Sequence, residues 1–329
     1  MCACVTCNED VDLNEMILNA TSQIPKGMVS TYGGIAKALG DVRASRAVGT
    51  VLAKNPRPFV VPCHRVVYGD GRTGWYGGIR NGADRKLELL RAEGVKVVDG
   101  RVEDFERVHF SKFRIPSILK DLAREQERLQ ALVIERDDFS GPEFIAGLDV
   151  AYEGTIGHAS MVKIRLSDLK VVDEADFSAE ARFPYIPSYL SYRELPLLRH
   201  LIHNDEGTIY LIDGQGQLHP RGFGIACHVG VCLDVPTIGA AKSLLQGNVE
   251  GEGHKAPIRL NGRLLGCQLH PEGRARTYVS VGHRVSLKTA TEICNGLMVR
   301  GVPEPLRLAH IRCGELARKA KRGKGICAS

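Results

Sequence analysis

The chain has 329 residues, of which 43% are hydrophobic and 25% charged, with a net charge of +6. At roughly 150 residues per domain, this length predicts about two domains. The composition excludes a disordered chain, and the mild basic excess is compatible with a nucleic-acid partner without establishing one. No apolar run reaches the roughly 18 residues that a membrane span needs. The N-terminus shows no secretory signal, so we expect a cytoplasmic protein that contacts no membrane.

Ten cysteines are scattered through the chain, which is typical of reduced thiols in a cytosolic protein. Cys2, Cys4 and Cys7 form a cluster that could hold a metal ion, but no second cluster completes a four-ligand zinc site. We therefore favour a frayed, thiol-bearing chain end. Cys227 and Cys232 lie in apolar surroundings and are expected to be small core residues.

Two parts of the chain carry different structural signals. Residues 12–98 indicate short helices around a compact hairpin, whereas the residues from about 142 onward alternate strands with helices. The segment 99–106 between them is charged and is interpreted as part of a linker. We predict an N-terminal domain over residues 1–110 and a C-terminal domain over residues 111–329, which ends in a basic tail.

An amphipathic segment, residues 120–136, is expected to form the helix that opens the second domain. Leu122, Leu129 and Leu132 recur at spacings that bring them on or near one face of such a helix. We expect this apolar face to pack against the second domain.

Residues 30–40 predict a short helix that begins at a Ser or Thr cap and stops at Gly40. A second helix is predicted from about residue 44 to 54, with an inward face made of Val48, Val51 and Leu52. Two short helices joined by a glycine-containing turn are typical of a helix-turn-helix, whose second helix reads a DNA groove. The basic residues at or near that helix are Arg43, Arg46 and Lys54.

The segment Pro-Cys-His-Arg-Val-Val that contains Cys63 and His64, preceded by Asn55, resembles the active-site segment of the O6-alkylguanine-DNA alkyltransferases. The resemblance extends over about residues 12–98 and implies a helix-turn-helix, winged-helix-like catalytic domain. It makes Cys63 the nucleophile, His64 the group that draws off its proton, Glu93 the group that orients the imidazole, and Asn55 the hinge asparagine. Only a thiolate attacks carbon efficiently, and the thioether that forms is not easily hydrolysed, so each molecule acts once without a cofactor.

The same resemblance assigns DNA contacts. Tyr32 corresponds to a tyrosine on the phosphate side, and Arg46 to the arginine that fills the gap left by a flipped base, whose extrusion costs a few kcal/mol. Residues 74–78 correspond to the loop that covers the alkyl pocket. Trp75 and Tyr76 are bulky for that loop, so we expect a narrow pocket that favours small groups such as methyl.

In the second half, two apolar runs each lead to an aspartate, Asp149 and Asp213. A carboxylate buried at the end of an apolar strand is costly unless it is paired or binds a metal. Two of them on neighbouring strands would form an oxygen site suited to Mg²⁺. The alternative is that both acids cap helices or turns.

Four motifs in order, in residues 183–194, 213–226, 234–243 and 280–286, resemble signatures of endonuclease V. The resemblance covers about residues 119–318 and implies an α/β, ribonuclease H-like fold with a mixed central sheet. It also implies cleavage of DNA at the second phosphodiester 3′ to a deaminated base, chiefly hypoxanthine, with uracil and xanthine as further substrates.

The resemblance to endonuclease V implies the following site residues. Asp149, Glu194 and Asp213 form the acidic metal site, which His310 approaches, and the metal is Mg²⁺ with Mn²⁺ as a substitute. His219 and Lys242 lie near the scissile phosphate. Tyr185, between Pro184 and Pro187, belongs to a wedge that enters the duplex at the lesion, although an ordinary core aromatic is the alternative. His228 and His283 are interpreted as packing or structural hydrogen-bonding residues.

The sequence therefore predicts a fused, bifunctional DNA-repair enzyme that acts on double-stranded DNA. In one alternative, the first half is only a DNA-binding module that delivers a lesion nuclease, but binding alone needs no nucleophile. In another, the nuclease cuts at inosine in RNA. No oligomer interface is readable in the sequence, and we expect a monomer.

Overall fold

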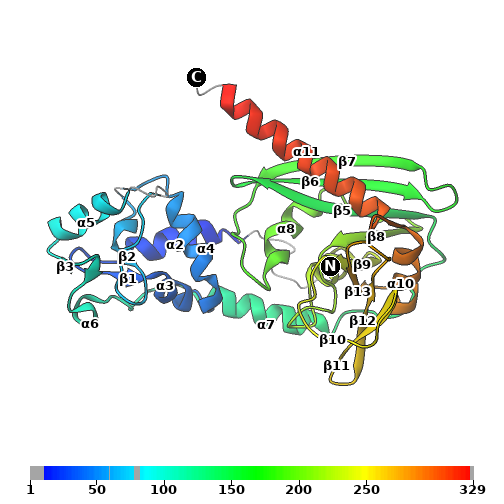
Figure 1. Cartoon of the computed structure of the whole chain (residues 1–329), viewed down its shortest axis with the longest axis horizontal. Helices are drawn as coiled ribbons and strands as arrows, with labels where there is room; N and C mark the ends of the chain where they lie inside the picture. The colour runs from blue at the N-terminus through cyan, green and yellow to red at the C-terminus, as the bar shows by residue number, and fades with distance from the viewer. Residues whose placement is uncertain (1–10, 59, 78–81, 327–329) are drawn as a thin grey trace. The chain divides into compact units, whose positions relative to one another are not determined.

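The structure is a computed structural model that describes residues 11–58, 60–77 and 82–326 (Figure 1). The predicted cysteine cluster at Cys2, Cys4 and Cys7 lies outside the described residues. The chain divides into two compact units: the first holds residues 11–124 together with 182–187, and the second holds residues 125–181 and the described residues from 188 onward. The predicted division between residues 110 and 111 stays a prediction.

The first unit is built from short elements. Its helices and strands are α2 (Leu13–Ser22), β1 (Ser30–Thr31), α3 (Tyr32–Ala38), η1 (Val42–Ala44), α4 (Ser45–Ala53), η2 (Cys63–Arg65), β2 (Val66–Val67), α5 (Ala83–Ala92), β3 (Val97–Val98), β4 (Arg101–Val102) and α6 (Phe105–Val108). Strand β1 pairs in parallel with β2, and β3 pairs antiparallel with β4.

The predicted helix pair is present as α3 and α4. The Thr31 hydroxyl accepts from the backbone N–H of Gly34 at 2.8 Å and so caps α3. Gly40 ends the turn after α3 with φ +107°, a conformation that favours glycine. Val48 and Leu52 are buried as predicted, while Val51 is only half-buried.

The charged segment 99–106 is not a linker. It carries β4 and the start of α6, and Val102 is buried with Val67, Leu90 and Val97 in the core of the first unit. Its charges face solvent while alternate apolar side chains point inward, so charge alone misidentified the segment. Likewise, α7 (Ile118–Gln130) ends earlier than predicted, and Leu132 lies beyond it with 50% of its surface exposed.

The second unit contains a mixed nine-stranded sheet in the order β10-β11-β12-β13-β9-β8-β5-β6-β7. Strands β5, β8 and β9 are parallel neighbours, and the other neighbouring pairs are antiparallel. The strands are β5 (Phe144–Glu153), β6 (Ile156–Arg165), β7 (Val171–Glu180), β8 (Thr208–Asp213), β9 (Thr237–Ala241), β10 (Asn248–Val249), β11 (Lys255–Leu260), β12 (Arg263–Leu269) and β13 (Thr277–His283).

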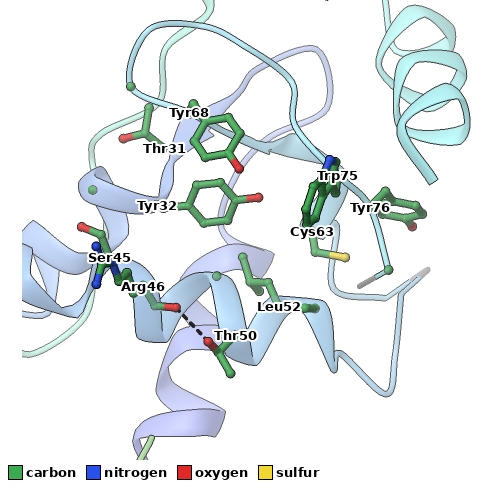
Figure 2. Close-up of a pocket in the computed structure, with 15 residues that line it drawn as sticks. Thr31, Tyr32, Ser45, Arg46, Thr50, Leu52, Cys63, Tyr68, Trp75 and Tyr76 are labelled. Atoms are coloured by element: carbon green, nitrogen blue, oxygen red, sulfur yellow. Dashed lines mark hydrogen bonds between the residues drawn. The ribbon is translucent and has the colours of Figure 1, made fainter. Parts of the chain in front are cut away.

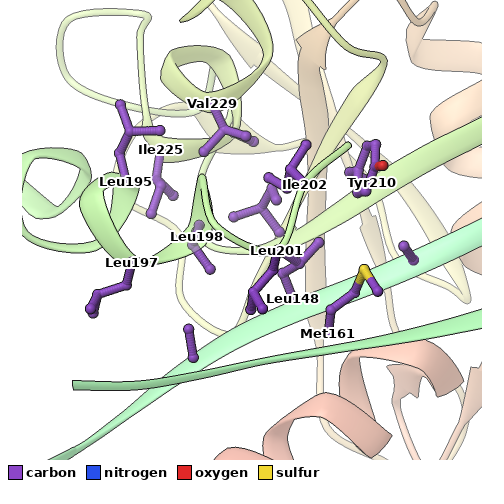
Figure 3. Packing of buried hydrophobic residues seen from close by; sticks show 14 of the residues in the cluster. Leu148, Met161, Leu195, Leu197, Leu198, Leu201, Ile202, Tyr210, Ile225 and Val229 are labelled. Atoms are coloured by element: carbon purple, nitrogen blue, oxygen red, sulfur yellow. The ribbon is translucent and has the colours of Figure 1, made fainter. Parts of the chain in front are cut away.

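Helices cover both faces of this sheet: α8 (Leu190–Leu198), α9 (Ile225–Leu233), α10 (Leu287–Gly296) and α11 (Glu304–Ile326). A short hairpin, β14 (Met298–Val299) with β15 (Val302–Pro303), precedes α11. Leu148 of β5 packs with leucines of α8 on one face (Figure 3). Ile145 points to the other face and packs with Ala290 and Leu306. Alternation along β5 therefore builds two cores. None of the described helices combines the length and the apolar composition that a membrane span requires.

Candidate active sites

Cys63 begins the single turn η2 and is 7% exposed. The side-chain amide of Asn55 donates to the Cys63 sulfur at 3.3 Å and to the carbonyl of Val61 at 3.0 Å. The Asn55 side-chain oxygen in turn accepts from the backbone N–H of Arg57 at 2.9 Å. Both ends of the Asn55 amide are thus fixed, and its N–H is held toward the sulfur.

His64 is linked through its Nε2 to Glu93 Oε1 at 3.0 Å. Arg65 donates to both oxygens of the same carboxylate, from Nε at 2.8 Å and from Nη2 at 2.7 Å. Burial acts to raise the pKa of Glu93, but the hydrogen bonds from Arg65 and His64 outweigh it and lower this pKa to about 2. Glu93 is therefore a carboxylate at neutral pH, and Arg65 is a member of the group that the sequence did not predict.

The other ring nitrogen of His64, Nδ1, is buried and has no hydrogen-bond partner among the described residues. Burial lowers the pKa of His64, although Glu93 opposes this. The imidazole is therefore neutral at physiological pH and has a free position for one more hydrogen bond.

Cys63 lines a cavity of about 740 Å³ with Tyr32, Arg46, Tyr68 and Trp75 (Figure 2). Its volume lies within the range of small-molecule sites. The Trp75 side chain is 61% exposed. Trp75 and Tyr76 both line this cavity, and the expectation that their rings favour small alkyl groups stays a prediction.

Lys86 of α5 is another member of this site that the sequence did not predict. It is 1% exposed, and its Nζ donates to the carbonyls of Val66 at 2.6 Å and Trp75 at 3.4 Å. The ammonium also lies 5.9 Å from the centre of the Tyr32 ring. Burial lowers the pKa of Lys86 to about 8. Lys86 thus joins β2 to the loop that lines the cavity.

The second candidate site lies on the parallel part of the large sheet. Leu148 of β5 is paired with Ile212 of β8, so Asp149 and Asp213 follow at the same level of adjacent strands. Asp213 is the last residue of its strand, as predicted, whereas β5 continues past Asp149 to Glu153. These two acids lie within strands and cap no helix, so the alternative assignment is wrong.

Glu194 lies on α8 and is 9% exposed. Burial, followed by the charges of Asp149 and Asp213, raises the pKa of Glu194 well above its ordinary value. Burial and then Asp149 also raise the pKa of Asp213, although Lys242 opposes the shift. The structure thus brings the three predicted carboxylates into one electrostatic group.

Three further side chains contact these acids. His310 Nδ1 lies 2.6 Å from Asp149 Oδ2, and Lys242 Nζ donates to Asp213 Oδ2 at 2.6 Å. Cys313, one helical turn after His310, places its sulfur 3.7 Å from the same oxygen of Asp149. Asp149, His310 and Cys313 are a group that could hold a metal ion, since their donor atoms lie within 4.8 Å of one another.

The remaining predicted residues have varied positions. His219 is buried, and its Nδ1 accepts from the backbone N–H of Arg221 at 3.2 Å. Tyr185 is 62% exposed, so the alternative of a core aromatic is wrong. His228 packs edge-on against Tyr192, and His283 Nδ1 accepts from the backbone N–H of Ile134, which confirms their structural roles.

The family model described as Endonuclease V matches residues 127–311, and the model described as the DNA binding domain of 6-O-methylguanine DNA methyltransferase matches residues 12–95. The bifunctional methyltransferase/endonuclease of Picrophilus torridus is 39% identical over 310 residues, which are 94% of this chain and 98% of that protein. The chain belongs to the bifunctional methyltransferase/endonuclease family. The member from Thermoplasma volcanium is 36% identical and covers 92% of this chain and 89% of its own.

The second half of this bifunctional methyltransferase/endonuclease chain is also similar to solved structures. One is Ciona intestinalis Endonuclease V in complex with a 24mer DNA containing an inosine followed by a ribo-adenosine. Its TM-score is 0.55 at 28% identity, over 61% of this chain and 98% of that one. The predicted pairing of two families and the predicted two-domain fold are confirmed.

Proposed function

We propose that the first domain moves the alkyl group of an O6-alkylguanine in double-stranded DNA irreversibly to Cys63. The observation that carries this proposal is the environment of the Cys63 sulfur. Cys63 lines a large cavity, and an amide N–H of Asn55 donates to its sulfur. The adjacent residue, His64, is hydrogen-bonded to the Glu93 carboxylate. A DNA-binding module without transfer activity would need none of these groups.

The roles follow from the chemistry of the side chains. His64, neutral and with Nδ1 unpaired among the described residues, takes the thiol proton directly or through a water. The thiolate attacks the alkyl carbon, the carbon–sulfur bond forms as the carbon–oxygen bond breaks, and the freed guanine regains a proton from solvent. Glu93 holds the imidazole and balances its new positive charge, and the Asn55 N–H stabilises the thiolate.

We assign Tyr32 and Arg46 to DNA contacts, since both line the cavity that holds Cys63. Burial, then Tyr68, raises the pKa of Tyr32 to about 12, so its phenol stays a hydrogen-bond donor. Arg46 is exposed on α4, the second helix of the helix-turn-helix. From there its side chain would enter the base stack and replace the extruded guanine.

The test is intact-mass spectrometry after mixing the protein with duplex DNA that carries one O6-methylguanine. We expect a gain of one methyl group, mapped to Cys63 and absent from Cys63→Ala. A protein that binds this DNA and gains no mass would leave the first domain as a targeting module only.

For the second domain, we propose cleavage of DNA at the second phosphodiester 3′ to a deaminated base, chiefly hypoxanthine. Asp149, Glu194, Asp213 and His310 would hold a divalent cation, Mg²⁺ or Mn²⁺. The structure supports this fit, because Asp149 and Asp213 follow paired residues of adjacent strands, and burial, together with these two charges, raises the pKa of Glu194, so three carboxylates share one site. When bound, the ion supplies an activated water and Lewis-acid stabilisation of the leaving 3′ oxygen.

The chain's own residues have distinct tasks in this nuclease. Asp149 is fixed by the backbone N–H of Val150 at 2.7 Å, and Asp213 is held by Lys242. Because the Lys242 side chain is 54% exposed, its ammonium is also available to a phosphate of the cut strand. We assign His219 to the same phosphate and Tyr185 to stacking at the lesion, which its exposed ring supports.

The nuclease test uses a duplex with one inosine, in the presence of Mg²⁺. Asp213→Asn is expected to remove nicking, whereas Asp168→Asn, which removes a carboxylate paired with Arg165 in the turn after β6, should keep it. Equal nicking by both variants would reject the acidic site. The Ciona complex motivates a second substrate in which a ribonucleotide follows the inosine; faster cutting there would favour RNA as the target.

We also propose that the protein works as a monomer in the cytoplasm. A reducing compartment suits the proposed alkyl transfer, since Cys63 must remain a free thiol to accept an alkyl group. Size-exclusion chromatography with light scattering tests the monomer, and fractionation of cells tests the compartment.

A further inference from the structure

Cys313 brings a sulfur atom to the proposed nuclease site. It lies three residues after His310 on α11, so both side chains leave the same face of the helix. Cys313 is fully buried, and its sulfur lies 3.7 Å from Asp149 Oδ2. His310 Nδ1 lies 2.6 Å from that same oxygen. Three chemically different donors, an oxygen, a nitrogen and a sulfur, therefore converge.

Their spacing fits a tetrahedral ion. A zinc ion binds sulfur at about 2.3 Å and carboxylate oxygen at about 2.0 Å, so two such ligands at a tetrahedral angle are about 3.5 Å apart. The observed separation of 3.7 Å between the Cys313 sulfur and Asp149 is close to this value. His310 and Asp149 must separate slightly, and the His310 side chain, 62% exposed, has room to move.

The donor types distinguish this site from the proposed Mg²⁺ site. Mg²⁺ prefers oxygen ligands, whereas thiolate and imidazole favour Zn²⁺ and other thiophilic ions. We propose that Asp149, His310 and Cys313 form a second, overlapping site for a thiophilic divalent cation, with its fourth position open to water. On binding, Cys313 releases its thiol proton to solvent.

This site would inhibit the nuclease. Both ions require Asp149 and His310 as ligands, so a bound thiophilic cation prevents Mg²⁺ from binding at the proposed nuclease site. The competition rests on the proposed nuclease function, whereas binding of the thiophilic ion does not. The two parts therefore need separate measurements.

Binding is tested with Co²⁺, which gives a thiolate-to-cobalt charge-transfer absorption, followed by displacement with Zn²⁺. We expect the band in the parent protein and in Cys227→Ser, where the new hydroxyl takes over the contact of a buried sulfur with the Val281 carbonyl. Cys313→Ser and His310→Ala should lose it. To remove the N-terminal cysteines and the reactive Cys63, every protein also carries the changes Cys2→Ser, Cys4→Ser, Cys7→Ser and Cys63→Ser.

An equal band in Cys313→Ser, with its fold confirmed by circular dichroism, would overturn the proposal. Competition is then measured as the Zn²⁺ concentration that halves nicking of inosine DNA at a fixed Mg²⁺ concentration. Loss of the sulfur ligand should raise this concentration by about tenfold or more, relative to Cys227→Ser. If none of these proteins nicks DNA, the proposed nuclease fails, while the cobalt band still decides the metal site.

Discussion

Gly147 of β5 lies directly against the backbone of Pro305 in the first turn of α11. A Cβ atom added at Gly147 would lie 2.3 Å from the Pro305 carbonyl carbon and 2.5 Å from the Leu306 nitrogen. Gly147 lies two residues before Asp149, so this close approach holds the start of α11 against β5 near that acid. Farther along α11, His310 and Cys313 contact the Asp149 carboxylate. Because Gly147 has no side chain, α11 can pack closely enough on β5 to reach the proposed metal site.

Gly147→Ala should therefore displace α11 and separate His310 from Asp149. We expect inosine nicking to fall sharply and the second domain to lose about 1–3 kcal/mol of stability, the usual cost of overpacking. Alkyl transfer should remain. The control is Gly296→Ala, where the added methyl group meets open space. Thermal denaturation and nicking assays check this, and wild-type nicking by Gly147→Ala would contradict it.

Glu93→Gln should slow alkyl transfer by about 100-fold, the scale of general acid–base effects. The amide removes the charge that holds His64 and Arg65 in place. Glu88→Gln on α5, the helix that ends at Glu93, is the matched control, because Glu88 is exposed and paired only with Arg85 among the ion pairs of the described residues. Single-turnover methyl transfer to Cys63 measures the rates, and equal rates for both variants would exclude Glu93 from the mechanism.

Glu93 should also make the stability of the first domain depend on acid pH. Its pKa falls from 4.5 to about 2 on folding, because Arg65 and His64 outweigh the effect of burial. The stabilisation is therefore fully present above about pH 4.5 and lost as the pH falls toward 2. Urea denaturation followed through Trp75, the one tryptophan of the chain, measures this. Glu93→Gln should have a lower free energy of unfolding than Glu88→Gln, and this difference should shrink as the pH falls. A difference that stays constant with pH would contradict the assignment.

Arg46→Ala should impair alkyl transfer from duplex DNA by about tenfold or more, because extruding a base costs a few kcal/mol that this side chain would offset. Transfer from the free alkylated base should change little. Arg43→Ala removes a nearby arginine that is paired with Asp41 and serves as the control. The ratio of duplex to free-base rates is the measurement, and an unchanged ratio in Arg46→Ala would show that the arginine does not fill the stack.

Much of both sites was predictable because local sequence carries it. Cys63 and His64 are adjacent, and Asp149 and Asp213 follow apolar runs whose alternation predicts strands. Thr31 and Gly40 mark the ends of a helix through their own capping and backbone preferences. Such signals need only neighbours in the chain.

The tertiary structure decided which distant side chains meet. No local pattern predicts the contact of Arg65 with Glu93, of Lys86 with the Val66 carbonyl, or of Cys313 with Asp149, because each depends on how elements pack. The charged segment 99–106 was misread for the same reason, since burial of Val102 depends on partners far along the chain. Sequence alone thus determined the two families and the principal reactive groups. Packing determined the ionic partners, the open cavity and the sulfur at the nuclease site, because charge and burial depend on three-dimensional neighbours.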